Sequence, residues 1–267
     1  MTTVLAVLLG AVQGVTEFLP ISSKTHLIVV PALLGERPPS LPFIVLLHLG
    51  TLVALVLYFA RDLWRIAVDL VRGGDGRKLA ILLVVASVPA AFLGLLFEET
   101  FERLLSDPRN VAFSLVATAM ILVGAEWLAG GLPGLGTRRR LARPLHSEVT
   151  TREAIGIGIA QAVALLPGVS RSGSTMATGL ALGVRRDGVA RFSFLLAIPA
   201  IAGANILELP KVVDRGIGTP ELAGFAAALV TGFASVALLL RYLRRYTYLP
   251  FAAYCLVFAL TAGLTLS

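Results

Sequence analysis

Six apolar segments are long enough to cross a lipid bilayer as helices, and they constrain the fold more than any other feature. A helical crossing needs about 20 predominantly apolar residues. Lipid offers the backbone no hydrogen bonds, so a crossing is a helix or part of a closed barrel, and continuous apolar runs exclude the barrel. The sequence therefore predicts an all-α integral membrane protein with about six transmembrane helices. The segments are 41–60, 79–97, 111–129, 192–209, 221–240 and 248–266.

Composition and charge agree with a membrane protein. Charged residues make up only 15% of the 267 residues, whereas soluble domains have about 25%. The net charge of +7 does not indicate a nucleic-acid partner, because the basic residues lie in short loops where they orient a membrane protein. The beginning of the chain lacks a basic region followed by a cleavage site, so we expect it to be retained. The single cysteine, Cys255, cannot form an internal disulfide.

Two further apolar segments are too short to cross, and a polar break interrupts each. Their second arms have only 8 and 10 residues, which at about 1.5 Å per residue reach part of the way through the bilayer core. We therefore predict two re-entrant helix-loop-helix hairpins. Irregular backbone at membrane depth persists only beside protein or a water-filled cavity, so both breaks are candidate walls of a site. The arms and break are 3–19, 20–26 and 27–34 in the first hairpin, and 154–166, 167–173 and 174–183 in the second.

The hairpins divide a single membrane domain, residues 1–267, into two similar halves. Residues 1–130 and 153–267 each contain one hairpin followed by three crossings, and residues 131–152 form a basic linker. Because three is odd, the second half is predicted to be an inverted repeat of the first, as in many transporters. The linker side carries 16 Lys and Arg residues and the other side 6, which predicts a cytoplasmic linker and both termini outside. The hairpins would then enter from opposite sides, and their tips could meet near the midplane.

Polar side chains in the first hairpin form a candidate chemical site. Ionisable groups inside a membrane are costly and usually functional. Gln13 and Glu17 are four residues apart and share one helix face. Ser22, Ser23 and His26 follow on what we expect to be an irregular turn. This hairpin thus offers a carboxylate, an imidazole and hydroxyl groups.

The second hairpin offers groups suited to an anion. The Arg171 guanidinium matches the geometry of phosphate for bidentate binding. Gly168 and Gly173 permit close approach of the backbone, and the residues after Gly173 are expected to open a helix whose N–H groups favour an anion. Hydroxyl groups come from Ser170, Ser172, Ser174 and Thr175.

Motifs at both breaks carry a resemblance to a known family. They are Gln13-x-x-x-Glu17, Pro20-x-Ser22-Ser23-x-x-His26 and Pro167-Gly168-x-Ser170-Arg171-Ser172-Gly173, together with the segments 43–57 and 192–199. The chain resembles the undecaprenyl-diphosphate phosphatase family of the BacA/UppP type from about residue 5 to its C-terminus. The resemblance implies a metal-assisted phosphatase of the bacterial inner membrane. Such an enzyme recycles the lipid carrier of cell-wall synthesis, and the family is associated with bacitracin resistance.

Site roles follow from the resemblance and from the chemistry of the residues. We expect Arg171 to hold phosphate oxygens of a polyprenyl diphosphate, and Glu17 with Gln13 to hold a divalent cation, Mg²⁺ first and Ca²⁺ as the alternative. Ser23 is the candidate nucleophile with His26 as acid or base, and direct attack by water is almost as well supported. The remaining substrate-binding residues are predicted to be Ser22, Gly168, Ser170, Ser172, Gly173, Ser174 and Thr175.

Other interpretations of these residues stay open. Glu17 and Arg171 could form a purely structural ion pair, and the serines could act as caps or turn residues. His48 could face the cavity or simply pack.

A transporter or flippase for polyprenyl phosphate or another anion is the rival function, because broken helices in inverted repeats are common in transporters. Crowding of a carboxylate, a histidine and serines at one turn favours the enzyme. We expect the site to face outside, since Glu17 and His26 belong to the hairpin that enters from there. The sequence does not fix an oligomeric state, and a homodimer is compatible with it.

Overall fold

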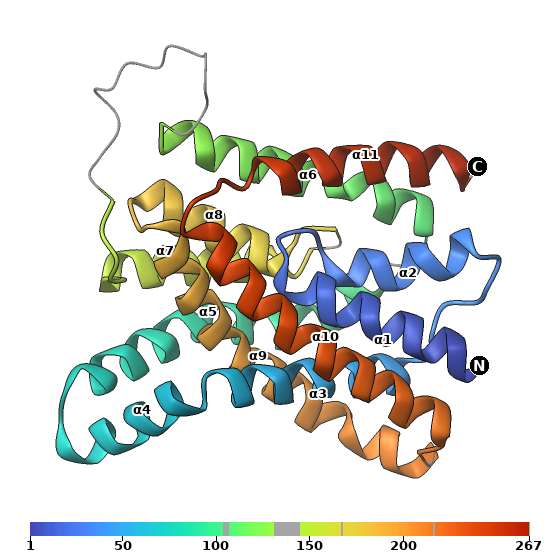
Figure 1. The fold of residues 1–267 in the computed structure, drawn as a ribbon, viewed down its shortest axis with the longest axis horizontal. Coiled ribbons are helices and arrows are strands. Elements are labelled where there is room, and N and C mark those ends of the chain that lie inside the picture. The colour runs from blue at the N-terminus through green and yellow to red at the C-terminus, as the bar shows by residue number, and fades with distance from the viewer. Residues whose placement is uncertain (104–106, 131–144, 167, 216, 267) are drawn as a thin grey trace.

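The computed structural model describes residues 1–103, 107–130, 145–166, 168–215 and 217–266 (Figure 1). Most of the predicted linker, residues 131–144, and Pro167 of the second break lie outside the described residues. The described residues form helices joined by short connections. In chain order these are α1 Thr3–Phe18, α2 Ser23–Leu33, α3 Leu41–Tyr58, α4 Ala60–Arg72, α5 Asp75–Arg103, α6 Pro108–Leu128, α7 Thr151–Val163, α8 Arg171–Leu182, α9 Arg186–Arg215, α10 Thr219–Leu243 and α11 Leu249–Thr265.

Each predicted crossing corresponds to one helix, and the all-helical membrane fold is confirmed. Helices α3, α5, α6, α9 and α10 are long and apolar enough to span a bilayer. α11 is shorter, with 17 residues, and packs along α6. Large apolar side chains point outward from these helices, as a lipid environment requires. Examples that are more than half exposed are Leu57, Phe92, Val230, Leu238 and Val257.

The connection between the first two predicted crossings, residues 61–78, is not an irregular loop, because most of it is the amphipathic helix α4. Leu63, Ile66 and Leu70 recur at helical spacing between charged residues, and Ile66 is buried. A search for apolar runs of bilayer length misses such a helix because half of its surface is polar. Trp64 on α4 is 72% exposed. A short helix with this pattern is typical of one that lies along the membrane surface.

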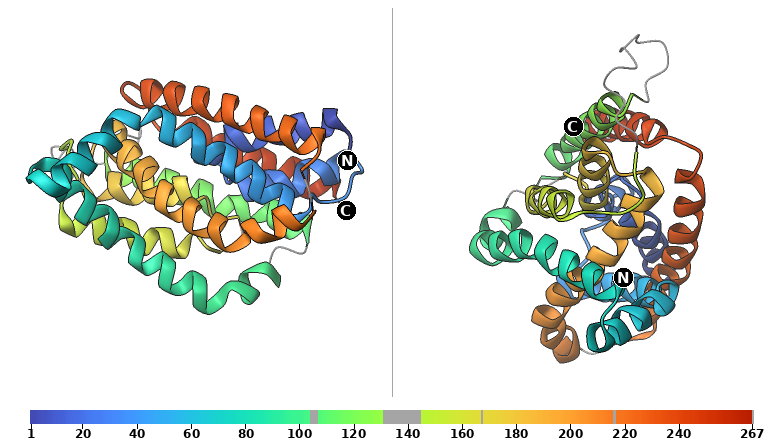
Figure 2. Two further views of the ribbon diagram at one scale, coloured as in Figure 1. Left: turned by 90° about the horizontal axis from the view of Figure 1, so that it is seen from below. Right: turned by 90° about the vertical axis from the view of Figure 1, so that its left-hand side faces the viewer.

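The two hairpins lie in opposite halves of the molecule, α1 and α2 in one and α7 and α8 in the other (Figures 1 and 2). Both chain termini lie at the end where α1 begins. α4 and the connection between α10 and α11 lie at the opposite end. The basic residues of α4 and of the connection between α10 and α11 therefore lie at the end away from the termini.

The second helix of each hairpin begins earlier than predicted. α2 starts at Ser23 and α8 at Arg171, so Ser23 and His26 lie on a helix rather than on the irregular turn. In α8 the cause is a side-chain cap, because Ser170 Oγ accepts a hydrogen bond of 3.0 Å from the Gly173 N–H. The cap places Arg171 at the first position of the helix instead of in the preceding loop.

Each hairpin packs against a crossing helix of the other half. α1 lies along α10, where a Cβ added at Gly10 would be 2.1 Å from the Gly224 carbonyl oxygen. α7 lies along α5, where a Cβ added at Gly158 would be 2.7 Å from the Ala86 carbonyl oxygen. Small residues allow backbones to approach closely where no hydrophobic force draws helices together in lipid. These contacts fix both hairpins firmly enough to position a site.

Candidate active site

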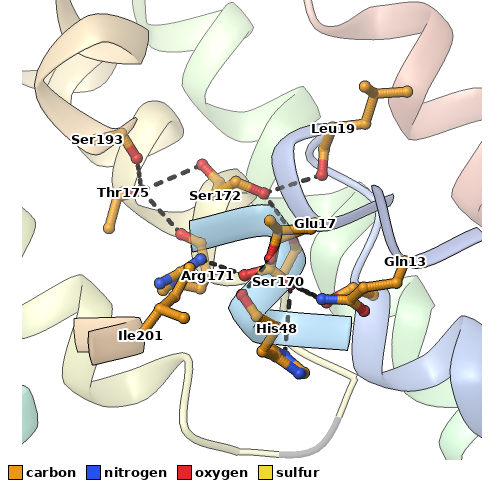
Figure 3. Close-up of polar contacts among 12 residues, drawn as sticks. Gln13, Glu17, Leu19, His48, Ser170, Arg171, Ser172, Thr175, Ser193 and Ile201 are labelled. Carbon is orange, nitrogen blue, oxygen red and sulfur yellow. Dashed lines mark hydrogen bonds and ion pairs between the residues drawn. The ribbon is translucent and has the colours of Figure 1, made fainter. Parts of the chain in front are cut away.

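An ion pair between Glu17 and Arg171 joins the tips of the two hairpins (Figure 3). Glu17 lies in the last turn of α1, and Arg171 Nη2 donates to its Oε1. Ser172 adds a second link, since its Oγ donates a hydrogen bond of 2.9 Å to the Leu19 carbonyl oxygen. The breaks at 20–26 and 167–173, which are about 150 residues apart in sequence, therefore face each other directly.

Glu17 is the centre of a compact polar cluster. Its Oε2 accepts hydrogen bonds from Ser23 Oγ at 2.5 Å and from Gln13 Nε2 at 3.0 Å. His48 Nε2, from α3, lies 3.7 Å from the same oxygen. The Glu17 side chain is only 6% exposed, and a buried carboxylate is tolerated when a cation and hydrogen-bond donors surround it. The cluster brings the predicted metal ligands and the predicted nucleophile within contact of one another.

The turn before α2 is strained at Ser22. Alone among the described non-glycine residues, Ser22 has a positive φ, of 66°. A residue in such a region typically stores about 1–3 kcal/mol and persists only where its surroundings enforce it. His26 Nδ1 donates to the Ser22 carbonyl oxygen at 2.8 Å, and Thr25 Oγ1 donates to Ser22 Oγ at 3.1 Å. The strained turn directs the next residue, Ser23, toward Glu17.

His26 turns toward the last helix and not toward the carboxylate cluster. Its Nε2 is 2.8 Å from the Tyr254 hydroxyl, and its ring stacks on Phe258 with centroids 4.5 Å apart. Its other nitrogen is engaged by the Ser22 carbonyl oxygen. Both ring nitrogens are therefore occupied in this arrangement, and the structure does not bring the imidazole to the Ser23 hydroxyl.

The loop before α8 is held by α6. Thr118 Oγ1 donates to the Gly168 carbonyl oxygen at 2.8 Å and accepts from the Ser170 N–H at 3.0 Å. Gly168 has a φ of 72°, and a Cβ there would lie 1.5 Å from Ser114 Oγ. Only glycine fits this position, because both its conformation and its space exclude a side chain. Gly168 is thus required for the conformation of the loop before α8.

Most hydroxyl groups of the second hairpin have structural partners. Thr175 Oγ1 donates to the Arg171 carbonyl oxygen at 2.8 Å and also bonds to Ser193. Ser170 caps α8 and Ser172 bonds to Leu19, so three of the four hydroxyl groups have a partner within the protein. Ser174 differs, because its Oγ is buried and has no hydrogen-bond partner in the described part of the chain. Among the four hydroxyls of the second hairpin it is therefore the one whose role the described contacts do not explain.

The residues around Glu17 fit a divalent cation that arrives with a phosphorylated substrate. Within the described ranges no three His, Cys, Asp or Glu side chains gather into a ready-made metal site. Gln13 Oε1, however, is buried without a partner in those ranges, on the same side chain that contacts Glu17. An amide oxygen beside a carboxylate suits a hard cation that takes its other ligands from phosphate and water.

Sequence reasoning did not assign three residues of this region. His48 was visible as one polar residue within an apolar run, but nothing in the run indicated which helix it faces. Thr118 and Tyr254 lie in crossings that gave no local signal. Their roles arise only from packing between helices that are far apart in sequence.

Comparison with known proteins is consistent with this geometry. Residues 6–261 match the profile of the family described as Bacitracin resistance protein BacA. A protein from Pelobacter propionicus named Undecaprenyl-diphosphatase is 44% identical, over 94% of this chain and 93% of its own length. Proteins of the same name from Rubrobacter xylanophilus and Moorella thermoacetica are 43% and 42% identical, over 93% and 97% of this chain and 93% and 96% of their own. The chain belongs to the BacA family.

Proposed function

We propose that this protein hydrolyses undecaprenyl diphosphate to the monophosphate and inorganic phosphate, and so recycles the lipid carrier of cell-wall synthesis. Relatives that match nearly the whole chain are named for this activity. The observation that carries the proposal is the meeting of Arg171 with the Glu17–Ser23 pair between two hairpin tips. Phosphoryl transfer requires a positively charged group that binds phosphate, a carboxylate and a hydroxyl at one point, and the guanidinium of Arg171 is the positively charged group here.

Arg171 is the proposed phosphate-binding residue. Its bond to Glu17 uses Nη2, which leaves other donors of the guanidinium fork for phosphate oxygens. The side chain is 22% exposed, so a substrate can reach it. Arg171 also opens α8, and an anion is favoured at a helix N-terminus, where the first N–H groups have no intrahelical partner.

Ser23 is the proposed nucleophile, with Glu17 as its base. The Ser23 hydroxyl already donates to Glu17 Oε2 at 2.5 Å, so the carboxylate can take the proton as Oγ attacks the terminal phosphorus. The bond between that phosphorus and the bridging oxygen breaks, and undecaprenyl phosphate leaves. Water then hydrolyses the phosphoserine. Attack by a water molecule activated by Glu17 is the alternative, and it uses the same base.

His26 is proposed to position the nucleophile, given its two hydrogen bonds to Ser22 and Tyr254. A divalent cation is proposed beside Glu17 and Gln13, Mg²⁺ first and Ca²⁺ as the alternative. When bound, it supplies positive charge to the phosphate oxygens of the substrate. The unpartnered Gln13 Oε1 supports this assignment.

The proposed location is the bacterial plasma membrane, with the site open to the outside and the basic end in the cytoplasm. Lys24 is exposed on the first turn of α2 and offers a place to test the side of access. Lys24→Cys should react with a membrane-impermeant thiol reagent added to sealed cells, whereas the parent protein, whose Cys255 is buried, should not. Reaction only from the cytoplasmic side would contradict the outward orientation.

The function is tested by phosphate release from undecaprenyl diphosphate with purified protein in detergent, with Mg²⁺ or with chelator. Arg171→Ala should abolish release, while Arg185→Ala should keep it, because Arg185 is an exposed arginine paired with Asp187 away from the hairpin tips. In liposomes, transfer of undecaprenyl phosphate across the bilayer without release of phosphate would instead establish a carrier.

A further inference from the structure

We propose that His48 is a third protein ligand of the cation site, together with Glu17 and Gln13. This inference rests on the proposed function, in which a divalent cation binds with the diphosphate, and it adds a nitrogen ligand from a helix outside both hairpins. His48 lies in the middle of α3, and Figure 3 shows its side chain together with those of Glu17 and Gln13.

The tautomer of the His48 ring suits a metal ligand. Nδ1 lies 2.9 Å from the carbonyl oxygen of Ile44. A carbonyl oxygen only accepts hydrogen bonds, so Nδ1 carries a proton, and in the neutral ring Nε2 has a free lone pair. Metal-binding histidines have this arrangement, in which one nitrogen donates to a backbone carbonyl and the other binds the metal.

His48 Nε2 faces the carboxylate of Glu17. Glu17 Oε2 is 3.7 Å away, beyond hydrogen-bond length, and both atoms are acceptors when the ring is neutral. These two acceptors repel each other unless a positive charge lies between them, and a cation would bind both. Gln13 already contacts Glu17 through its Nε2, and its Oε1 is buried without a partner in the described ranges. A cation would also give that oxygen a partner, whereas a proton on His48 would not.

The proposed site is accessible and leaves coordination positions free for the substrate. The His48 side chain is 19% exposed and that of Glu17 6%, so the group is open on the His48 side. Three protein ligands leave positions free for phosphate oxygens and water. An imidazole nitrogen favours transition metals over Ca²⁺, so we expect this protein to bind Mn²⁺ more tightly than Ca²⁺.

The test uses Mn²⁺ as the probe and the purified full chain in detergent. Electron spin-echo spectroscopy of bound Mn²⁺ detects a ligand nitrogen, and labelling histidine with ¹⁵N shows whether that nitrogen is imidazole. The chain has three histidines. His48→Gln should remove the imidazole signal and weaken Mn²⁺ binding roughly tenfold or more. His146→Gln should leave the imidazole signal and the Mn²⁺ affinity unchanged, because His146 pairs with Glu153 at the beginning of α7, away from the hairpin tips.

Two outcomes would overturn the proposal. One is bound Mn²⁺ in the unmutated protein with no histidine-dependent signal, which is decisive even if His48→Gln does not fold. The other is a signal that persists in folded His48→Gln, as judged by gel filtration. Phosphate release measured on the same samples separates the two proposals. Phosphate release without the imidazole signal would support the phosphatase function and exclude His48 as a cation ligand. The imidazole signal without phosphate release would support His48 as a ligand and contradict the phosphatase function.

Discussion

The Tyr254 hydroxyl and His26 Nε2 are joined by a hydrogen bond of 2.8 Å between α11 and α2. Since Nδ1 of the ring donates to the Ser22 carbonyl oxygen, the neutral imidazole accepts at Nε2 and the phenol donates. The Tyr254 and Phe258 rings also stack on the imidazole. His26 therefore fastens the strained turn before Ser23 to the last helix of the chain.

Tyr254→Phe tests this positioning role. The substitution removes one hydrogen bond and keeps the stacked ring, so stability should fall by about 1 kcal/mol and phosphate release only severalfold. His26→Ala removes the bond to Ser22 as well and should have the larger effect on both. Thermal unfolding in detergent and phosphate release measure the two effects. Loss of activity in Tyr254→Phe as severe as in Arg171→Ala would show instead that the phenol takes part in proton transfer.

Arg171→Lys tests whether the site needs the guanidinium fork or only a positive charge. A lysine keeps the charge but cannot bind phosphate in a bidentate manner. We expect phosphate release to fall roughly 100-fold or more, since loss of one group that stabilises transition-state charge has about that effect. Arg185→Lys is the matched control and should be unchanged. Near-normal release by Arg171→Lys would show that Arg171 acts as a point charge.

Ser23→Ala and Ser22→Ala separate nucleophilic attack from turn structure. Ser23→Ala should abolish release if Oγ attacks phosphorus. Ser22 acts mainly through its backbone, so Ser22→Ala loses only the bond from Thr25 and should keep most of the activity. Release is measured together with a search for phosphoserine in rapidly quenched samples. Substantial activity in Ser23→Ala would establish direct attack by water, with Glu17 still as the base.

Gly168→Ala should destabilise the protein. Its φ of 72° is unfavourable for alanine, and the new Cβ would lie 1.5 Å from Ser114 Oγ. Overpacking of this kind costs about 1–3 kcal/mol, to which the backbone strain adds. Gly203→Ala in α9 is the control, because a Cβ there meets nothing within 4 Å, and alanine is the better helix former. Equal unfolding temperatures for the two variants would contradict the steric argument.

Glu126→Ala tests a buried ion pair away from the hairpin tips. Glu126 is fully buried, accepts from Arg186 Nε at 2.8 Å, and also accepts from the Tyr248 N–H at 2.7 Å. Removing one partner of a buried pair costs about 3–5 kcal/mol. The unfolding temperature should fall strongly, while activity per folded molecule should stay near normal. A specific loss of activity in folded Glu126→Ala would link this pair to the reaction.

The membrane fold could be predicted because bilayer thickness sets the length of a crossing, and a continuous apolar run reports that length. The two hairpins were also predictable, since short arms around Pro20 and the 167–173 break cannot span the core. α4 was missed because its apolar residues are spaced around a helix rather than continuous. The start of α8 was misplaced because a cap depends on one side-chain bond, from the Gly173 N–H to Ser170.

The sequence predicted which residues belong to the candidate site, but it predicted only some of the contacts between them. Glu17 and Arg171 could be paired in advance, because each is an ionisable group at a hairpin tip. The partners of the two histidines could not, because Tyr254 is 228 residues from His26 and His48 belongs to a crossing that looks purely apolar. Local spacing assigns a residue to a helix, but the packing of distant helices decides which group it meets.

The close contact of Gly10 with Gly224 has a consequence for biosynthesis. α1 enters the membrane early in translation, but its packing partner α10 is made only after most of the chain, 214 positions later. Until α8 follows, the Glu17 carboxylate has no Arg171 to neutralise it. The reaction centre is thus assembled among the last events of insertion. A chain truncated before α8 would therefore leave an uncompensated and costly charge in the bilayer.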